Sequence, residues 1–275
     1  MDYRYHCYIP AHDGRNELPF NPCTLLDFTL LRLSAGDSWS GSSGDREILA
    51  VVLGGTASFQ VGGEKFDGVG GRADVFSGRP HSVYIPAGVD FSVQATGGPV
   101  EIALPSAPSD LATAPYVIAP ERVATGRWGA ANFGRTYHQI LTEIAQPDLP
   151  ARRLIVGETY TPSGNWSTYP PHRHKTDNLP AEAAHEEMYY FRVAPAGGFG
   201  ICRMYTDEGY EENFTVRDHG MHMMPSGYHT VVSAPGYTTY YLWFLAGEQR
   251  TQGAHEDTDL AWVGKSVPTL RGLGL

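Results

Sequence analysis

Cysteine, basic charge and long apolar runs are all scarce in this chain of 275 residues. Its cysteines are odd in number and form no CxxC pair: Cys7, Cys23 and Cys202. This pattern argues against a disulfide framework and favours a reducing cytoplasm. The formal net charge is −10, and no basic stripe offers contacts to phosphate groups. We therefore expect neither a nucleic-acid partner nor an anionic membrane partner.

Segments that would place the chain in or across a membrane are also missing. No run reaches the roughly 18 apolar residues that a membrane-spanning helix needs. The first residues, MDYRYHCYIPAHDGR, contain no apolar stretch behind a positive start, so a secretory signal is not indicated. The sequence thus predicts a cytoplasmic protein without a membrane partner.

Helical periodicity is scarce, whereas turn-forming residues are abundant, with 32 glycines and 20 prolines. Between them recur short apolar or alternating runs such as LLDFTLLRL, EILAVVLGGTASFQVGG and EMYYFRV. Regular short strands with turn signals predict an all-β sandwich or barrel fold. Residues 104–120 are rich in proline, alanine and serine, which is typical of a crossover between domains. We therefore expect two domains, at residues 1–115 and 116–275.

An internal repeat supports this division. One run, REILAVVLGG, contains Glu47, and another, EEMYYFRVAP, contains Glu187. Pro86 lies 39 positions after Glu47, Pro225 lies 38 positions after Glu187, and each proline is followed two residues later by glycine. Aligning the two glutamates gives an offset of about 140 residues, so we predict the same β unit twice in tandem.

The second unit contains a cluster of candidate metal ligands. His172 and His174 would point to one face of a strand, because side chains at i and i+2 share a face. Glu187 opens the next apolar strand, and His229 follows the PSGYH turn. Three imidazoles and one carboxylate suit zinc, manganese, iron, nickel or cobalt. A lone HxH pair is a weak signal, and Glu186 is an alternative ligand, although the strand register favours Glu187.

The first unit has no such cluster. No HxH precedes Glu47, and Phe91 stands near the place that corresponds to His229. We therefore predict a structural N-terminal unit without a metal site and assign the chemistry to the C-terminal unit.

The order HxH, Glu and a later PxG…H resembles the metal motifs of cupins. The duplicated unit resembles a bicupin, which implies two tandem double-stranded β-helix (jelly-roll) barrels. The segments GNWSTYPPHRHKTDNLP, EEMYYFR, MPSGYH and APGYTTYYLWFLAG resemble the 5-deoxy-glucuronate isomerases of myo-inositol catabolism, the IolB family. That family is related to the KduI-type uronate isomerases, and the resemblance extends over almost the whole chain.

The resemblance implies a metal-dependent aldose–ketose isomerase that converts 5-deoxy-D-glucuronate to 2-deoxy-5-keto-D-gluconate. Its ligands to one divalent ion, with zinc or manganese preferred over iron, nickel or cobalt, would be His172, His174, Glu187 and His229. The 12 residues between His174 and Glu187 exceed the usual cupin spacing, but this insert is itself a family feature. Lys175 departs from the aspartate that is commoner there. A homo-oligomer, a dimer or larger, is expected by analogy alone.

A uronate substrate also needs a cationic partner and a proton-transfer group. The candidate for the carboxylate is Arg203, unless it is a structural arginine paired with Asp207 or Glu208. Hydroxyl-binding candidates, which are also candidates for core packing, are Tyr189, Tyr205 and Tyr241. The candidate bases lie in the insert, which could close as a lid: Asp177, Lys175 and His185.

Two other functions are compatible with the sequence. Three histidines and one glutamate on such a barrel also suit iron or manganese in a cupin dioxygenase. The third possibility is a non-catalytic sugar-binding bicupin. The complete ligand set of the second unit argues against it.

Overall fold

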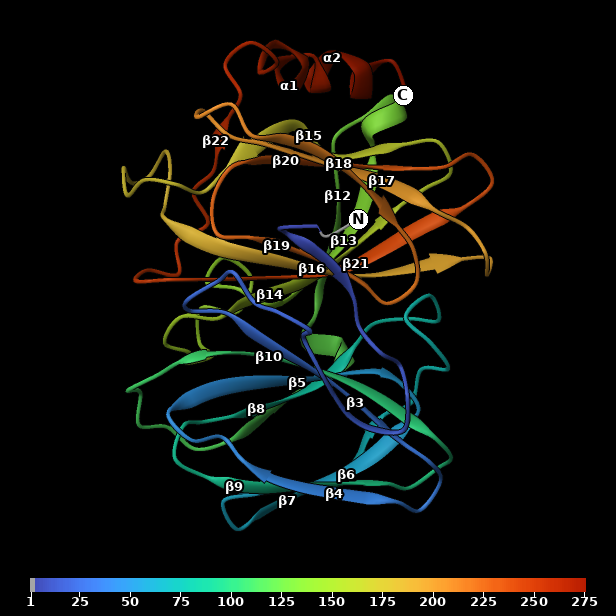
Figure 1. Cartoon of the computed structure of the whole chain (residues 1–275), viewed down its shortest axis with the longest axis vertical. Helices are drawn as coiled ribbons and strands as arrows, with labels where there is room; N and C mark the ends of the chain where they lie inside the picture. Colours follow the sequence, from blue (N-terminus) through green and yellow to red (C-terminus); the bar gives the residue numbers. More distant parts are fainter. Residues whose placement is uncertain (1–2) are drawn as a thin grey trace.

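The computed structural model describes residues 3–275, which form a nearly all-β protein (Figure 1). The helical elements of this part of the chain are short: η1 (Pro120–Arg122), η2 (Ala131–Phe133), α1 (Trp262–Lys265) and α2 (Val267–Gly272). None of the helices in the described range has the length and apolar character needed to traverse a bilayer.

The first half of the chain forms two antiparallel sheets. The larger has six strands, in the order β11 (Tyr116–Ile118), β8 (His81–Ile85), β5 (Arg46–Gly54), β10 (Val100–Pro108), β3 (Asp27–Leu33) and β2 (Gly14–Glu17). The smaller has four strands, in the order β4 (Ser38–Ser42), β9 (Asp90–Ala95), β6 (Thr56–Val61) and β7 (Glu64–Gly70).

The second half repeats this arrangement with more strands. Its larger sheet contains β1 (His6–Tyr8), β19 (Gly220–Met224), β16 (His185–Ala194), β21 (Thr238–Gly247), β14 (Ile155–Thr161), β13 (Arg135–Leu141) and β12 (Ala124–Trp128), in that order. Its smaller sheet contains β18 (Glu211–Val216), β17 (Gly200–Tyr205), β20 (Tyr228–Ser233), β15 (Trp166–Arg173) and β22 (His255–Glu256). The N-terminal strand β1 therefore joins the second half, by pairing with β19.

The four sheets lie in layers, with the two large sheets in the middle (Figure 1). One apolar core fills the space between the sheets of the first half, for example Ile48 against Phe91. A second fills the second half, including Phe191 and Phe214. The third and largest core joins the two large sheets, so the halves share a continuous apolar interface. The all-β fold predicted from the sequence is confirmed, whereas the division at residues 115 and 116 stays a prediction.

The structure corrects the internal alignment by one residue. Ile48, and not Glu47, lies on the interior face that corresponds to the face of Glu187, because Ile48 belongs to the core of the first half. Glu47 instead corresponds to Glu186. With this register the distance to the following proline, Pro86 or Pro225, is 39 positions in both units.

Glu47 and Glu186 have reciprocal roles between the halves. The buried Glu47 accepts hydrogen bonds from the backbone N–H groups of residues 152–154 in the second half. Glu186 accepts them from the backbone N–H groups of residues 24–26 in the first half.

Candidate metal centre

Two facing sheets of the second half bring the four predicted ligands together. His172 lies on β15, His174 directly follows that strand, and His229 lies opposite His172 on β20. Glu187 comes from β16 in the large sheet. His172, His174 and Glu187 each offer one potential donor atom, and these three atoms lie within 4.8 Å of one another. The imidazole of His229 completes the group, with its centroid 4.7 Å from that of His172.

The carboxylate of Glu187 is the point toward which these rings converge. Its Oε2 atom lies 3.1 Å from Nε2 of His229 and 3.5 Å from Nε2 of His174. Despite these distances, the buried Oε2 accepts no well-directed hydrogen bond. A buried carboxylate oxygen without a partner is unfavourable in free energy, so a cation bound beside it would stabilise the site.

Backbone carbonyls set the tautomers of two histidines. Nδ1 of His174 lies 2.9 Å from the carbonyl oxygen of Gly253, and Nδ1 of His229 lies 3.4 Å from that of Gly227. Because a carbonyl only accepts, both Nδ1 atoms carry the proton and both Nε2 atoms present lone pairs to Glu187. Lone pairs and a carboxylate facing one another repel unless a cation lies between them. The residues present therefore fit a divalent metal ion.

Burial keeps His172 and His174 neutral, as metal ligands must be. It lowers the pKa of His172 well below its ordinary value, with further lowering by His229 and His174. Burial likewise lowers the pKa of His174 to about 4. Burial alone would raise the pKa of Glu187, but the neighbouring His229 and His174 outweigh it and lower that pKa. At neutral pH His172 and His174 are thus neutral beside the buried negative charge of Glu187, which is the protonation state that metal binding requires of them.

Two of the predicted substrate-binding tyrosines lie beside this cluster. Tyr189 is buried and its hydroxyl lies 2.9 Å from Nε2 of His229, so it donates to the lone pair there. Tyr241 packs against Tyr189 with 4.5 Å between ring centroids, and its hydroxyl pairs with Ser167. Both hydroxyls face the interior of the second half.

Arg203 and Tyr205 lie elsewhere. On β17 the alternate residues Cys202 and Met204 fill the core, so Arg203 and Tyr205 point to the outer face of the small sheet. Nε of Arg203 donates to Oε1 of Glu211 at 2.8 Å, and its guanidinium lies over the Tyr205 ring. The structure therefore separates both residues from the histidine cluster by the thickness of the sheet.

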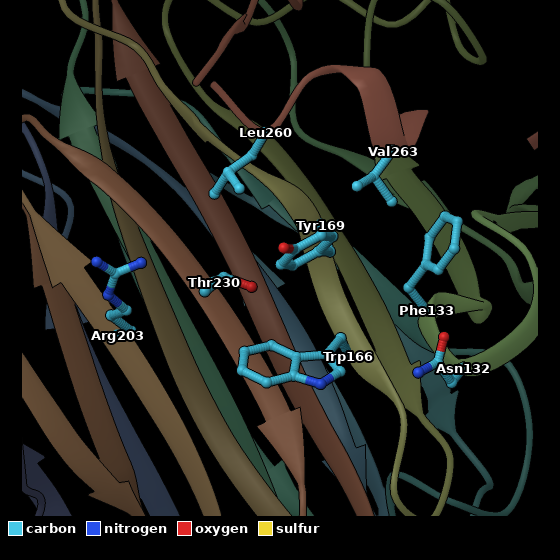
Figure 2. Close-up of a pocket in the computed structure, with 8 residues that line it drawn as sticks. All are labelled: Asn132, Phe133, Trp166, Tyr169, Arg203, Thr230, Leu260 and Val263. Carbon is cyan, nitrogen blue, oxygen red and sulfur yellow. The ribbon is translucent and has the colours of Figure 1, made fainter. Parts of the chain in front are cut away.

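The outer face that carries Arg203 has a cavity of its own, of about 370 Å³ (Figure 2). Leu260 and Val263 of the C-terminal segment line it on one side, and the aromatic rings of Trp166 and Tyr169 line the sheet side. This cavity is largely apolar in its lining and does not include any of the four candidate metal ligands.

The three candidate bases are placed differently from one another. Lys175 is partly exposed and pairs with Asp207 and Glu208. Asp177 accepts a hydrogen bond from the backbone N–H of Ala184 and so holds the insert in shape. His185 is buried on the same face of β16 as Glu187, and its ring centroid lies 5.7 Å from that of His174. Only His185 among these three adjoins the cluster.

One cationic residue on the interior face of the second half was missed from the sequence. Arg135 opens β13, whose sequence RTYHQIL is partly buried in its first three residues and buried in the other four. The signal was present in the alternation along this strand, because His138 and Ile140 share one face and Arg135, Tyr137 and Gln139 share the other. The direction of each face becomes apparent only when both neighbouring sheets are known.

Superposition on known structures shows the fold class of this chain. The oxalate decarboxylase of Lactobacillus farciminis superposes with a TM-score of 0.69 at 12% identity, covering 100% of this chain and 94% of that chain. An IolB-like protein of Salmonella typhimurium LT2 superposes with a TM-score of 0.88 at 29% identity, covering 95% of this chain and 99% of the other. The fold is that of the bicupins, as the sequence predicts.

Sequence comparison then identifies the family. The KduI/IolB family model matches residues 14–263. The 5-deoxy-glucuronate isomerase of Geobacillus kaustophilus is 39% identical over 88% of this chain and 86% of its own length. The chain belongs to the KduI/IolB family, and it is an isomerase.

Proposed function

We propose that this protein is a metal-dependent isomerase that converts 5-deoxy-D-glucuronate to 2-deoxy-5-keto-D-gluconate in inositol catabolism. The observation that carries the proposal is the convergence of histidine lone pairs on the buried, unpartnered Oε2 of Glu187. The relatives named for this reaction support the choice of substrate.

The proposed ligands are His172, His174, Glu187 and His229, and the preferred ions are zinc and manganese. When bound, such an ion supplies a Lewis acid that polarises a carbonyl group and acidifies the neighbouring C–H bond. The residues of the chain hold the four donors deprotonated and enclose them within the second half of the molecule. The Tyr189 hydroxyl lies 2.9 Å from Nε2 of His229, so when an ion occupies that lone pair the hydroxyl is free to offer a hydrogen bond at the edge of the cluster.

His185 is the proton-transfer group that the geometry supports best. Its Nε2 lies 2.7 Å from the carbonyl oxygen of Gln249, so Nε2 carries the proton. Its Nδ1 consequently has a free lone pair, and this atom is buried without a hydrogen-bond partner. An oriented imidazole with an unoccupied basic nitrogen beside the cluster is equipped to accept a proton from a substrate carbon. Lys175 and Asp177 are already engaged in other contacts.

The direct test follows the aldehyde of 5-deoxy-D-glucuronate by NMR under nitrogen, together with metal analysis of the purified protein. We expect loss of the aldehyde and its hydrate, appearance of the ketone, and about one divalent ion per chain. Dialysis against a chelator should abolish turnover, and adding zinc or manganese should restore it. Full turnover by metal-free protein would contradict the proposed chemistry.

Two adjacent glutamates provide a matched pair of variants. Glu187→Gln should lose metal and activity together, because an amide replaces the buried charge. Glu186→Gln should keep both, since Glu186 faces residues 24–26 and not the cluster. Equal metal content in the two variants would exclude Glu187 as a ligand.

The same samples test the alternative function. A cupin dioxygenase would consume oxygen in proportion to substrate, whereas an isomerase converts it equally well under nitrogen. The predicted homo-oligomer stays a prediction, and light scattering of the purified protein measures it.

A further inference from the structure

Arg135 lies on the interior face of the second half. In β13 the buried His138 and Ile140 face the interface between the two large sheets, where His138 contacts Glu158. Arg135 and Tyr137 alternate with them and take the opposite face. There Tyr137 stacks on Trp128, with 4.0 Å between centroids, and the Arg135 guanidinium lies 5.5 Å from the Trp128 ring.

The Arg135 guanidinium has no acidic partner within residues 3–275. Its only hydrogen bond there is a long one, from Nη1 to the carbonyl oxygen of Phe133 at 3.4 Å. Its Nε atom is buried and has no hydrogen-bond partner. Burial lowers the pKa of Arg135, and the charge of Glu256 opposes that effect without forming an ion pair. A buried cation left unpaired in this way is costly, and a bound anion would relieve the cost.

The start of β13 lies beside the small sheet of the second half, which carries two of the candidate metal ligands. The short helix η2 just before it contacts β15, the strand that carries His172. Asn165, directly before β15, donates hydrogen bonds to the carbonyl oxygens of Ala131 and Gly134 and fixes this arrangement. The Trp128 ring next to the Arg135 guanidinium lies 6.3 Å from that of Trp243. Trp243 pairs across β21 and β16 with Tyr189, whose hydroxyl lies 2.9 Å from Nε2 of His229.

We propose that Arg135 binds the carboxylate of the sugar-acid substrate. This inference rests on the proposed function, since it names the residue that binds the carboxylate end of the proposed substrate, opposite to the carbonyl end. A guanidinium offers two parallel N–H donors that match a carboxylate, and Arg135 has donors free for this purpose. Arg203 does not, because Glu211 occupies it and the sheet separates it from the cluster. The interior then holds a cation-binding cluster near one end of the substrate and a fixed positive charge near the other.

The test compares Arg135→Met, Arg135→Lys and the control Arg203→Met. For 5-deoxy-D-glucuronate we expect KM to rise about 10- to 100-fold in Arg135→Met, as for the loss of a charged hydrogen-bonded pair. The KM of Arg135→Lys should lie between those of Arg135→Met and wild type, because lysine keeps the positive charge but lacks the two parallel N–H donors. Arg203→Met should match wild type. Metal content should be equal in all four proteins.

A second substrate separates carboxylate binding from a structural effect. For the neutral 5-deoxy aldose with a hydroxymethyl group in place of the carboxylate, Arg135→Met and wild type should have the same kcat/KM. The unfolding midpoint of Arg135→Met should equal or exceed that of wild type, since an unpaired buried charge is removed. Equal losses on both substrates, or a lower midpoint with unchanged KM, would overturn the inference.

Calorimetric titration with D-glucuronate and D-glucose keeps this inference distinct from the proposed function. If wild type fails to isomerise 5-deoxy-D-glucuronate, the proposed function fails. Binding of glucuronate but not glucose, abolished in Arg135→Met, would still establish the carboxylate site. Undiminished glucuronate binding by Arg135→Met would refute it even in an active isomerase.

Discussion

Replacing Glu47 by glutamine should loosen the connection between the two halves of the molecule. Oε1 of Glu47 accepts the N–H groups of Arg153 at 2.6 Å and Leu154 at 2.8 Å. Oε2 accepts the N–H of Arg152 at 2.7 Å and the hydroxyl of Tyr84 at 2.6 Å. The amide of glutamine has one acceptor oxygen, so its NH₂ group must take the place of the other carboxylate oxygen and face the donors there.

The magnitude follows from these contacts. Two hydrogen bonds to a charged acceptor are lost, at about 1.5–3 kcal/mol each, and a buried backbone donor is left unpaired. Glu47→Gln should therefore lower the free energy of unfolding by about 3–6 kcal/mol. This is a large fraction of the stability of an ordinary domain, so part of the protein could be unfolded at physiological temperature.

Urea unfolding followed by tryptophan fluorescence measures the effect, with Glu248→Gln as the control. Glu248 also contacts Arg152 and Arg153, but it is exposed, so its loss should leave the free energy of unfolding nearly unchanged. If Glu47→Gln and Glu248→Gln were equally stable, the buried carboxylate would not be the connection that we infer.

Three further perturbations test other parts of the structure. Glu186→Gln should lower the unfolding free energy by about 1–3 kcal/mol, less than Glu47→Gln because Glu186 is partly exposed; urea unfolding checks this. Burial would raise the pKa of Glu158, but Arg72 and other partners lower it from 4.5 to about 2. The stability it provides is therefore complete above pH 4.5 and lost as the pH falls toward 2, and Glu158→Gln should flatten this dependence in thermal unfolding between pH 5 and pH 3. Gly157→Ala should lower the free energy of unfolding by about 1–3 kcal/mol through overpacking, because its Cβ would lie 2.1 Å from the Trp243 ring; an unchanged free energy in urea unfolding would contradict the packing.

The sequence contained information on the layering of the sheets that the prediction of individual strands did not use. The central strands of the two middle sheets, such as β5 and β21, are buried on both faces, and they read as the continuous apolar runs LAVVL and YYLWFLA. Strands of the outer sheets, such as β6 and β9, alternate between buried and exposed residues. The difference between continuous and alternating runs therefore predicts which sheets lie inside.

The choice between adjacent glutamates was harder. Side chains of Glu186 and Glu187 point to opposite faces of β16, one toward residues 24–26 and the other toward the histidines. Both faces are buried, so polarity does not distinguish them. The strand register favoured Glu187, whereas the internal repeat aligned Glu47 with the wrong neighbour. Equal spacing to Pro86 and Pro225 would have exposed the error, because a gap within a strand reverses every side chain beyond it.

The two arginines show the limit of pattern reasoning at a polar interior. In an outer-sheet strand such as β17, the face with Cys202 and Met204 is the apolar one, so Arg203 must point outward. In β13 neither face is exposed, and both carry polar residues, Arg135 on one and His138 on the other. His138 is explained by Glu158, a partner 20 residues along the chain, and Arg135 is left without an acidic partner in the described chain. An arginine on an enclosed face that no side chain neutralises has its natural partner outside the polypeptide. The unpaired guanidinium near the histidine cluster, rather than the well-paired Arg203, is therefore the group suited to a charged ligand.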